Sequence, residues 1–486
     1  MKGTDYMLKK SAFLLISLIF LLPTTGFSAS WQFDHELAAR QKADHLKWVL
    51  KNLVEAYKQV GHKDPGWDDL ALESLRAYAV WRNKSADRKG DELFIAANSG
   101  QKAMSKGCQD PMVMYVVAHT TEEIQNKNKR EVVFMYMMAG LTMKNYQYPP
   151  ARKIYAYLEG ANALIQMDSS AEKTREPVIK FLDDTKALFP ELVKDSGFTY
   201  PKWSYCCRRM RECYRGIGEA PEAAHRHVYE ALEKAGAGES LLKTIEGDFW
   251  IEYAWQARGN DFKVSSEGRR LAKERLENAL KVLVEAWHAD PKNDMAPSEC
   301  ISAMLYYGGD RNEMEFCFRH AIENSPRYYY YYGHKLYWLE PKWRGSIREM
   351  LDFGRECLAT QSWDTEIPFI LVEAHKAASR YGSGRYHSLP QQSYFRTEGV
   401  WPEIKAVYDE FLERYPKDYK RRCEYAYYAS LAGDWETAHR EFQAIGDNVY
   451  WPAFNDPEHY QALVYQARKH MKAKAAVPES EPKTGD

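Results

Sequence analysis

Hydrophobic residues recur along most of this chain at spacings of three and four, the period that places them on one face of an α-helix. Residues 34–60 are the clearest example, and the pattern stops at Gly61. The alternation of apolar and polar residues that marks a β-strand is nearly absent. The pattern predicts an all-α fold, with helices over residues 34–60, 70–81, 91–106, 111–126, 129–142, 150–166, 170–188, 220–235, 241–258 and 265–289.

Three polar stretches interrupt this pattern. We interpret residues 83–90 as a charged linker. Residues 382–400 have the composition of a long loop, of the kind that is often functional or mobile. The polar, proline-bearing end from residue 472 predicts a disordered tail.

A corner in the stretch 323–359 joins a tyrosine-rich helix to a new helix start through Pro-Lys-Trp at 341–343. Ser346 is placed to cap the new helix, and Glu349 follows three residues later, so each side chain can satisfy an amide of the other. We expect the helix behind this cap to bury a face made of Ile347, Met350, Leu351 and Leu358.

Two segments have the spacing of tetratricopeptide repeats. In residues 306–326 a Gly-Asp turn at 309–310 is followed by Phe318, Ala321 and Pro326 at the packing and closing positions. In residues 425–442 the corresponding positions are Ala426, a Gly-Asp turn at 433–434, Ala438 and Phe442.

The longer-range spacing agrees with this resemblance. Pro291 and Pro326 lie 35 residues apart, close to the family period of about 34. The signature Trp is missing, and insertions at 260–270 and 382–400 break the period. The chain therefore resembles a degenerate tetratricopeptide-like array over residues 245–446. The resemblance implies a right-handed superhelix (α-solenoid) of stacked helical hairpins, because no hairpin buries its apolar face alone.

A second resemblance rests on GCQDP at 107–111 and on RYYYYYGHKLYWLEPKWRGS at 327–346. These segments are similar to an exported bacterial family of unknown function that carries a Pro-Lys-Trp-x-Gly-Ser corner within tetratricopeptide-like helices. Arg344 occupies the variable position here. The resemblance implies a fold and an exported location, and it implies no activity.

The N-terminus has the order of a secretory signal peptide. Lys9 and Lys10 precede an apolar run at 11–22, and small residues follow at 28–30. The run is shorter than the roughly 20 residues that span a bilayer. We therefore expect export to the periplasm or the cell exterior and no integral membrane span in the mature chain, with an uncleaved anchor as the alternative.

The predicted organisation has five parts. They are a signal peptide at 1–30, an N-terminal helical region at 31–145, a middle helical region at 146–244, the repeat region at 245–446, and a C-terminal helix with its tail at 447–486.

Charge and motif content limit the kinds of partner and cofactor that we expect. The formal net charge is −1, so no basic field is available to gather nucleic acid, and no nucleic-acid partner is expected. No phosphate-cradling glycine loop, dinucleotide fingerprint or Gly-x-Ser-x-Gly elbow occurs in the sequence, and we predict no cofactor.

All eight cysteines follow the predicted signal peptide, and an oxidising compartment permits disulfides. Cys300 and Cys317 fall on successive helices of one hairpin and form the candidate disulfide. The equally weighted alternative is that both are small buried apolar residues. Cys206-Cys207 with Cys213 lacks the Cys-x-x-Cys spacing of a zinc site, so no metal site is predicted there.

Two histidine patterns resemble metal-binding motifs but do not complete one. His119-Thr-Thr-Glu-Glu123 has a Glu where a zinc-protease helix needs its second His, and we interpret it as a helix-surface pair. His225 and His227 are two positions apart, which splays them by about 200° on a helix and prevents them from sharing a metal.

The tyrosine run at 328–332 is the candidate recognition surface. Successive helical positions rotate by about 100°, so five consecutive tyrosines cannot all face one core. Tyr and Trp are favoured at recognition surfaces. We predict a partner-binding surface made of Arg327, Tyr328, Tyr330, Tyr331, His334, Lys335, Trp338 and Trp343, extended by Tyr425, Tyr427 and Tyr428. The alternative is packing between helices, with the hydroxyls donating to backbone carbonyls.

These features predict a non-catalytic scaffold that binds a protein or peptide partner. The alternative is an enzyme acting on cell-envelope carbohydrate or peptide, which an acid pair beside the tyrosines would favour. A third hypothesis, carbohydrate binding without turnover, requires that Tyr328–Tyr332 are not wholly buried.

Overall fold

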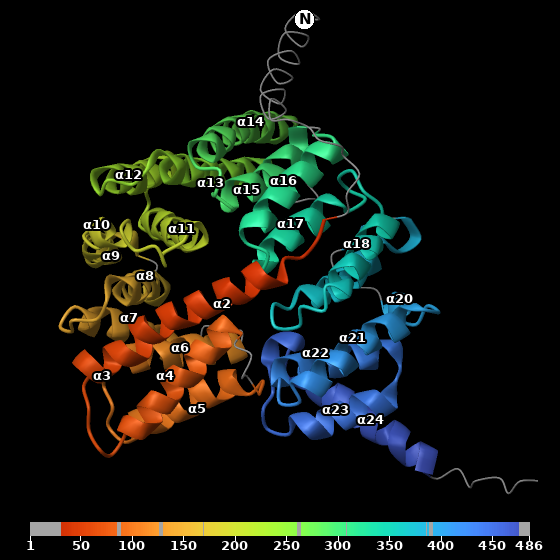
Figure 1. The fold of residues 1–486 in the computed structure, drawn as a ribbon. Coiled ribbons are helices and arrows are strands. Elements are labelled where there is room, and N and C mark those ends of the chain that lie inside the picture. The colour runs from red at the N-terminus through yellow and green to blue at the C-terminus, as the bar shows by residue number, and fades with distance from the viewer. Residues whose placement is uncertain are drawn as a thin grey trace, which may run out of the picture. The chain divides into compact units, whose positions relative to one another are not determined.

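The structure is a computed structural model that describes residues 31–84, 89–125, 130–168, 170–259, 264–307, 309–384, 386–387 and 392–475. Every secondary-structure element within these ranges is a helix. Figure 1 shows the helices following one another through short connections. The fold class is the predicted one: all-α, an α-solenoid of tetratricopeptide-like hairpins. In the described ranges no helix is both long and apolar enough to cross a membrane.

The chain forms two compact units, each built from two separate stretches of sequence. Unit 1 contains residues 31–41 and 182–338, and unit 2 contains residues 42–181 and 339–475. The regions predicted from the sequence are contiguous, because helix periodicity does not record which distant segments pack together.

The helices of unit 1 are arranged as consecutive pairs. Its N-terminal stretch is the start of α2 (His35–Leu50), and α9 (Ala171–Lys186) enters it at residue 182. The remaining helices are α10 (Phe189–Leu192), α11 (Tyr200–Gly216), α12 (Pro221–Lys234), α13 (Glu239–Arg258), α14 (Ser266–Ala289), α15 (Met295–Tyr307), α16 (Arg311–Asn324) and α17 (Tyr329–Trp338).

Unit 2 begins with the rest of α2, which continues through a π-helical turn, η1 (Lys51–Glu55), into α3 (Ala56–Val60). Its first stretch continues with α4 (Asp68–Asn83), α5 (Glu92–Ser105), α6 (Pro111–Gln125), α7 (Arg130–Met143) and α8 (Pro150–Met167). Its second stretch contains α18 (Ile347–Ala359), η2 (Ile367–Phe369), α19 (Ile370–Ala378), η3 (Ser379–Gly384), α20 (Gln392–Phe395), α21 (Val400–Arg414), α22 (Tyr419–Ala432), α23 (Trp435–Ile445), η4 (Trp451–Ala453) and α24 (Pro457–Ala475).

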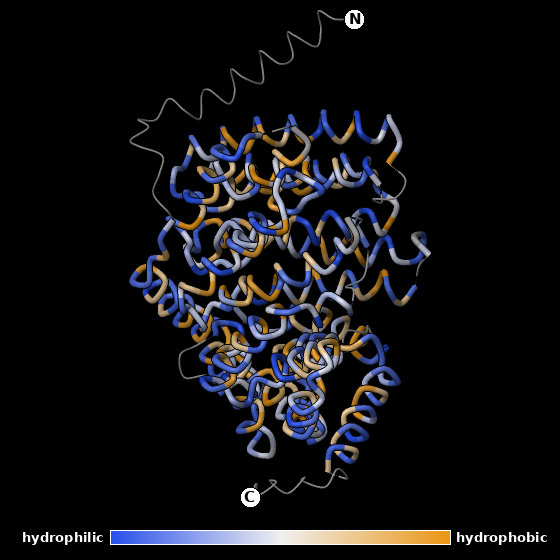
Figure 2. The backbone as a smooth tube through the Cα atoms, turned by 90° about the vertical axis from the view of Figure 1, so that its right-hand side faces the viewer, coloured by the Kyte–Doolittle hydropathy of each residue, from blue (hydrophilic) through white to orange (hydrophobic). Residues whose placement is uncertain are grey.

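Each predicted helix agrees with an observed helical segment to within two residues at both ends. Figure 2 shows the reason: hydrophobic and hydrophilic residues alternate along the turns of the helices, so the period is visible in the sequence. The sequence analysis assigned no helix to α11, because the buried side of that helix contains cysteines and the charged Arg211 rather than a regular aliphatic stripe.

Two further sequence predictions were partly wrong. The stretch 382–400 contains the short helix α20 and the end of η3, so its loop is shorter than expected. Helix α24 extends to Ala475, so the tail predicted to be disordered from residue 472 is helical at its start. The predicted signal peptide and residues 476–486 lie outside the described residues.

The repeat positions identified in the sequence have the expected roles. Phe318 and Ala321 of α16 are fully buried, as are Ala426 of α22 and Ala438 of α23. Gly433 has a left-handed φ of 82° at the turn between α22 and α23, a conformation that glycine adopts without steric cost. These hairpins therefore pack as tetratricopeptide units do, with small residues where helices cross closely.

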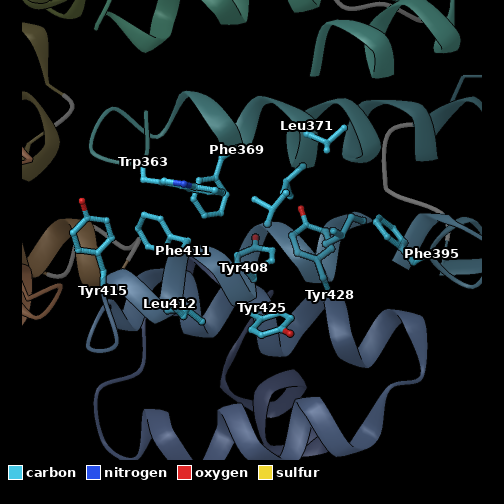
Figure 3. Packing of buried hydrophobic residues seen from close by; sticks show 13 residues of the cluster. Trp363, Phe369, Leu371, Phe395, Tyr408, Phe411, Leu412, Tyr415, Tyr425 and Tyr428 are labelled. Atoms are coloured by element: carbon cyan, nitrogen blue, oxygen red, sulfur yellow. The ribbon is translucent and has the colours of Figure 1, made fainter. Parts of the chain in front are cut away.

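Aromatic side chains fill the core of unit 2 between α19, α21 and α22. Figure 3 shows Phe369 of η2, Phe411 and Tyr408 of α21 and Tyr425 of α22 in this core. The rings of Tyr408 and Tyr425 are stacked at 4.9 Å, and Phe369 meets Phe411 edge-on at 4.9 Å. Buried aromatic pairs of this kind contribute roughly 0.5–1.5 kcal/mol each beyond their area.

The two stretches of unit 2 are joined by direct packing. Leu93 and Phe94 of α5 belong to the same buried cluster as residues of α22, α23 and α24. The Phe94 ring meets Tyr419 at 5.4 Å. The hydroxyl of Tyr450 donates to Glu123 of α6 at 3.0 Å. Side chains of α4, α5 and α6 are thereby fixed beside α22.

The Pro-Lys-Trp corner has a structural explanation. The Ser346 hydroxyl accepts a hydrogen bond from the Glu349 amide at 3.2 Å, and donates to the Glu349 carboxylate at 2.8 Å. The cap is therefore confirmed, although its second bond involves the hydroxyl rather than the backbone of Ser346. A Cβ atom at Gly345 would collide with the carbonyl of Leu339, so the corner closes only around a residue without a side chain. Met350 is fully buried, while Leu351 and Leu358 are partly buried against the aromatic core.

The eight cysteines are buried free thiols. The structure brings the thiols of Cys300 and Cys317 together as predicted, but it does not join them in a disulfide. The alternative interpretation, that both are small buried apolar residues, is the one that the structure supports.

Replacing Gly345 should test the corner. We expect Gly345→Ala to lower the free energy of unfolding by about 1–3 kcal/mol, because the new methyl group overlaps the backbone at Leu339. Urea unfolding followed by circular dichroism measures the change. The matched control is Gly333→Ala in the interior of α17, where no atom lies within 4 Å of the added Cβ. That control should be stabilised by about 0.5–1 kcal/mol. Equal effects of the two substitutions would contradict the explanation.

Thiol titration should test the state of the cysteines. The folded protein should react with a thiol reagent at none of them, because all eight are buried. After denaturation without reductant, all eight should react. A Cys300–Cys317 disulfide would reduce that number to 8 − 2 = 6, and this result would restore the sequence-based disulfide prediction.

Candidate binding face on alternate helices of unit 1

Four helices of unit 1 form a continuous row. Helix α11 contacts α13, α13 contacts α15, and α15 contacts α17, while the helices between them pair with their neighbours behind the row. This arrangement brings together residues that are far apart in the sequence. The binding face discussed below is the surface of these four helices that carries Tyr205, Arg208, Tyr328 and Tyr330.

The tyrosine run divides between this face and the core. Tyr328 is 39 % exposed and Tyr330 is 50 % exposed, whereas Tyr331 and Tyr332 are buried. The Tyr332 hydroxyl donates to the carbonyl of Pro326 at 2.9 Å. The run therefore contains both exposed and packed tyrosines, because successive side chains point about 100° apart.

Several predicted partner-binding residues are not on the face. Tyr331, Lys335 and Trp338 are buried, so their assignment to an exposed surface is wrong. The ammonium group of Lys335 pairs with Glu315 at 2.8 Å and lies 4.5 Å from the Phe318 ring. Arg327 is half-buried at the start of the run.

The proposed extension of the surface is also wrong. Tyr425 and Tyr428 are buried in the aromatic core of unit 2. Trp343, which was predicted as part of the surface itself, belongs to unit 2, whereas the binding face belongs to unit 1. Tyr427, also in unit 2, is partly buried beside the same core. Tyr328, Tyr330 and His334 are the predicted residues that the structure places on or next to the binding face.

An ion network lies beneath the exposed tyrosines. Arg208 and Arg211 of α11 donate to the two carboxylate oxygens of Asp248 on α13, at 2.5 and 2.8 Å. Arg211 also donates to Glu252 at 3.1 Å. Burial alone would raise the pKa of Asp248, but the two guanidinium groups outweigh it and hold the pKa below its ordinary value.

Arg208 connects this network to the surface. Its side chain is 41 % exposed, whereas Arg211 and Asp248 are fully buried. Burial raises the pKa of the Tyr330 hydroxyl, and the neighbouring guanidinium group of Arg208 opposes that rise. The face thus presents a phenol and a guanidinium group side by side, and the buried Asp248 fixes the position of the guanidinium.

Glu299 of α15 is a buried acid beside the same network. Its residue is 5 % exposed, and none of the described residues hydrogen-bonds to its carboxyl group. Burial, assisted by the negative charge of Asp248 and opposed by Arg208, raises its pKa to about 8. Its surroundings therefore favour the protonated, uncharged form of Glu299.

His334 is the predicted site residue nearest to this group. Its Nδ1 lies 2.9 Å from the hydroxyl of Ser298, and its ring contacts that of Tyr330 at 4.4 Å. Burial lowers the pKa of His334 to about 4. The imidazole is consequently neutral, and it supports Tyr330 rather than contributing a charge.

The other histidine patterns have packing roles. His225 stacks on Phe249 at 4.1 Å, and burial lowers its pKa to about 3. His227 stacks on Tyr214 at 4.7 Å, so the two histidines point to different neighbours as their spacing implies. Within the described part of the chain, no three His, Cys, Asp or Glu side chains converge to hold a metal ion.

Sequence reasoning missed Tyr205, Arg208, Asp248 and Glu299. One signal was available, since Arg208, Arg211 and Arg215 recur at helical spacing and mark one side of a helix. Their acidic partners lie about 40 residues further along the chain, on a neighbouring hairpin, and no local pattern connects the two groups.

Glu299 should make stability depend on pH. In the unfolded chain its carboxyl group titrates near its ordinary pKa of 4.5, and in the folded chain near 8. Between these values the folded state binds more protons, so stability falls as pH rises, ideally by about 1.4 kcal/mol per pH unit. Glu299→Gln should remove this contribution. The free energy of unfolding of the variant, relative to that of the natural protein, should therefore increase from pH 5 to pH 8, as urea unfolding measures.

The control for this comparison is Glu267→Gln, which changes an exposed carboxylate paired with Arg270. Its difference from the natural protein should stay constant over the same pH range. Parallel pH profiles for the natural protein and Glu299→Gln would show that Glu299 is ionised in the fold.

Comparisons with known proteins place the chain in no described family. No family model matches it, and no curated protein matches it. Among solved structures, the chain is similar to a monomeric mutant of IFIT1 with Gppp-AAAA. The TM-score is 0.33 and the identity 13 %, over 84 % of this chain and 78 % of that one. A likeness at this TM-score carries no argument about partner or activity, so the residues of the chain themselves must carry the functional conclusion.

Proposed function

We propose that this protein is an exported, non-catalytic helical-repeat scaffold that holds a protein or peptide partner on the binding face of α11, α13, α15 and α17. The observation that carries the proposal is the exposure of Tyr328 and Tyr330 beside the guanidinium group of Arg208 on a row of alternate helices. Stacked helical repeats form extended surfaces of this kind, and such surfaces hold partners.

The chemistry of the face suits protein recognition. Tyrosine supplies apolar area together with a hydroxyl group, and it loses little conformational entropy when it is bound. Tyr330 is oriented by His334 behind it and by Arg208 beside it. Groups held in place before binding lose less free energy on association than mobile ones.

Charge also favours recognition over catalysis. The guanidinium groups of Arg208, Arg211 and Arg215 face the carboxylates of Asp248 and Glu252. With Glu299 protonated, three positive charges meet two negative ones. The surplus positive charge lies at the exposed guanidinium of Arg208, where a carbonyl or carboxylate group of a partner can accept a hydrogen bond.

The enzymatic alternative depends on an acid pair beside the tyrosines, and Asp248 with Glu299 is such a pair. Both carboxyl groups are buried, and Asp248 is bound to two arginines. A glycosidase needs two carboxyl groups that reach its substrate. The pair therefore supports a structural role more than a hydrolytic one. Carbohydrate binding without turnover shares the exposed tyrosines and is an alternative outcome of the test below.

Export is part of the proposal and rests on the sequence alone. The order of charged, apolar and small residues over residues 1–30 supports a signal peptide, and the similarity to an exported family supports the same location. Fractionation of cells that express the full chain should recover it in the periplasm or the medium. Recovery in the cytoplasm would remove this part of the proposal without affecting the binding face.

A photo-crosslinking experiment tests the binding face. A benzoylphenylalanine residue replaces Tyr205 on α11, which is exposed in the natural protein. Illumination of cells that express the full chain should give a covalent adduct with a specific protein. Tyr330→Ala in the same chain should reduce the adduct yield at least about tenfold, because exposed aromatic anchors often contribute 2 kcal/mol or more to binding.

The matched control is Tyr465→Ala, which removes a 64 % exposed tyrosine from α24 in unit 2. The control should leave the adduct yield unchanged. An adduct with glycan or RNA only, a protein adduct insensitive to Tyr330→Ala, or no adduct above background would overturn the proposed function.

A further inference from the structure

A cavity of about 230 Å³ lies within unit 2, where its two stretches of sequence meet. One side is formed by the end of α4, Gly90, the start of α5 and Glu123 of α6. The other side is formed by Glu366 before η2 and by Asp418 and Lys420 at the start of α22. This volume is below the roughly 300–1,000 Å³ of sites for drug-sized molecules. A ligand of this cavity must therefore be small.

Charged side chains of both signs line the cavity. The cations are Arg82, Lys84 and Lys420, and the anions are Glu123, Glu366 and Asp418. Three charges of each sign make the lining neutral overall, yet strongly polar.

Two ion pairs cross between the walls. The ammonium group of Lys84 lies 2.8 Å from Glu366, and that of Lys420 lies 3.1 Å from Glu123. Burial alone would lower the pKa of Lys420, but Tyr450 and Glu123 outweigh it and raise the pKa. Burial likewise tends to raise the pKa of Glu123, but Lys420 outweighs it and lowers the pKa. Both groups are therefore charged at neutral pH.

The backbone at this cavity is strained. Lys84 has a φ of 48° and Glu366 a φ of 65°, and they are two of the three non-glycine residues with positive φ in the described part of the chain. Each such conformation costs on the order of 1 kcal/mol, and strained residues cluster at ligand sites. Here both residues line the same cavity and pair with each other.

An apolar side completes the cavity. Trp81, Leu93 and Phe94 line it, and Phe94 is held by its contact with Tyr419. The backbone at Gly90 approaches that of Asp418 so closely that a side chain at position 90 would overlap it. Residues of both stretches therefore frame the cavity.

The sequence motif around His119 belongs to this frame. His119 packs edge-on against Tyr78 at 5.7 Å and at a tilt against Trp81 at 5.9 Å, and burial lowers its pKa to about 3. Glu123, one turn further along α6, lines the cavity. The histidine therefore supports the Trp81 wall while the glutamate contributes charge.

We infer that this cavity binds a small zwitterion, a free α-amino acid with an apolar side chain. An anion would meet three carboxylates, and a cation would meet three cationic groups. An uncharged apolar molecule would remove water from six charged groups without replacing its hydrogen bonds. A zwitterion can direct its ammonium group to the carboxylates and its carboxylate to the ammonium groups, while its side chain covers the apolar wall.

The inference is independent of the proposed scaffold function, because the cavity lies in unit 2 and the binding face lies in unit 1. Calorimetric titration of the full chain tests it with leucine, methionine and phenylalanine as probes. Three compounds related to phenylalanine serve as charge controls: phenylpropionate as anion, phenethylamine as cation, and N-acetylphenylalaninamide as neutral molecule. We expect at least one amino acid to bind, at least tenfold more tightly than any charge control.

Substitutions locate the site. Lys84→Met should weaken amino-acid binding at least tenfold, because the ligand carboxylate loses its cationic partner. Lys405→Met is the matched control: this lysine also lies in unit 2, has comparable exposure, and pairs with an acid, Asp434, at 3.3 Å. Lys405→Met should bind as the natural protein does. If Lys84→Met does not fold, the isosteric Glu123→Gln provides the same test through the ammonium group of the ligand.

Three results would overturn the inference. The first is that none of the three amino acids binds. The second is that a charge control binds as tightly as its amino acid. The third is that neither Lys84→Met nor Glu123→Gln weakens binding more than Lys405→Met does.

Discussion

Arg211 and Asp248 are both fully buried, and the ion pair between them offsets the cost of removing each charge from water. Removing either charge from water costs several kcal/mol, and a close pair with further hydrogen bonds offsets that cost. Asp248 receives two guanidinium groups as well as the hydroxyl of Ser204. The pair fixes the register between α11 and α13, and the rest of the face follows from it. Arg208 is held with its guanidinium at the surface, and Glu299 is left without a cation of its own.

The hydrophobic period explains why the helices could be predicted so closely. An amphipathic helix must place one apolar stripe against a neighbour whatever the tertiary arrangement is. The stripe can therefore be recognised from the local sequence alone. The same reasoning fails for α11, whose buried side includes Arg211 and several cysteines in place of aliphatic residues. It also fails to assign the units, because the contact of Phe94 with Tyr419 joins residues more than 300 positions apart.

The candidate site was predictable to a smaller extent. The rotation of about 100° per residue correctly implied that the tyrosine run divides between surface and core. It did not indicate which members face outward, because that depends on where α15 and α16 contact α17. Tyr331 and Lys335 therefore proved to be buried, while Tyr328 and Tyr330 are exposed. The arginine network could not be predicted from local sequence patterns, because the arginines and their acidic partners lie on different hairpins.

Glu299 and Glu123 show how the same side chain acquires opposite properties in the two units. Burial acts on both in the same direction, since removal from water disfavours the charged form. Beside Glu299 the Asp248 charge reinforces burial and Arg208 is engaged elsewhere, so the pKa rises. Beside Glu123, Lys420 binds the carboxylate directly and Tyr450 donates to it, so the pKa falls.

The binding face therefore keeps a surplus of positive charge at neutral pH, whereas the cavity in unit 2 keeps equal numbers of both signs. A surplus of one sign favours a partner that brings acceptor groups, and a balanced set favours a ligand that carries both charges. The difference between the two sites thus comes from the neighbours of a buried glutamate rather than from the residue itself.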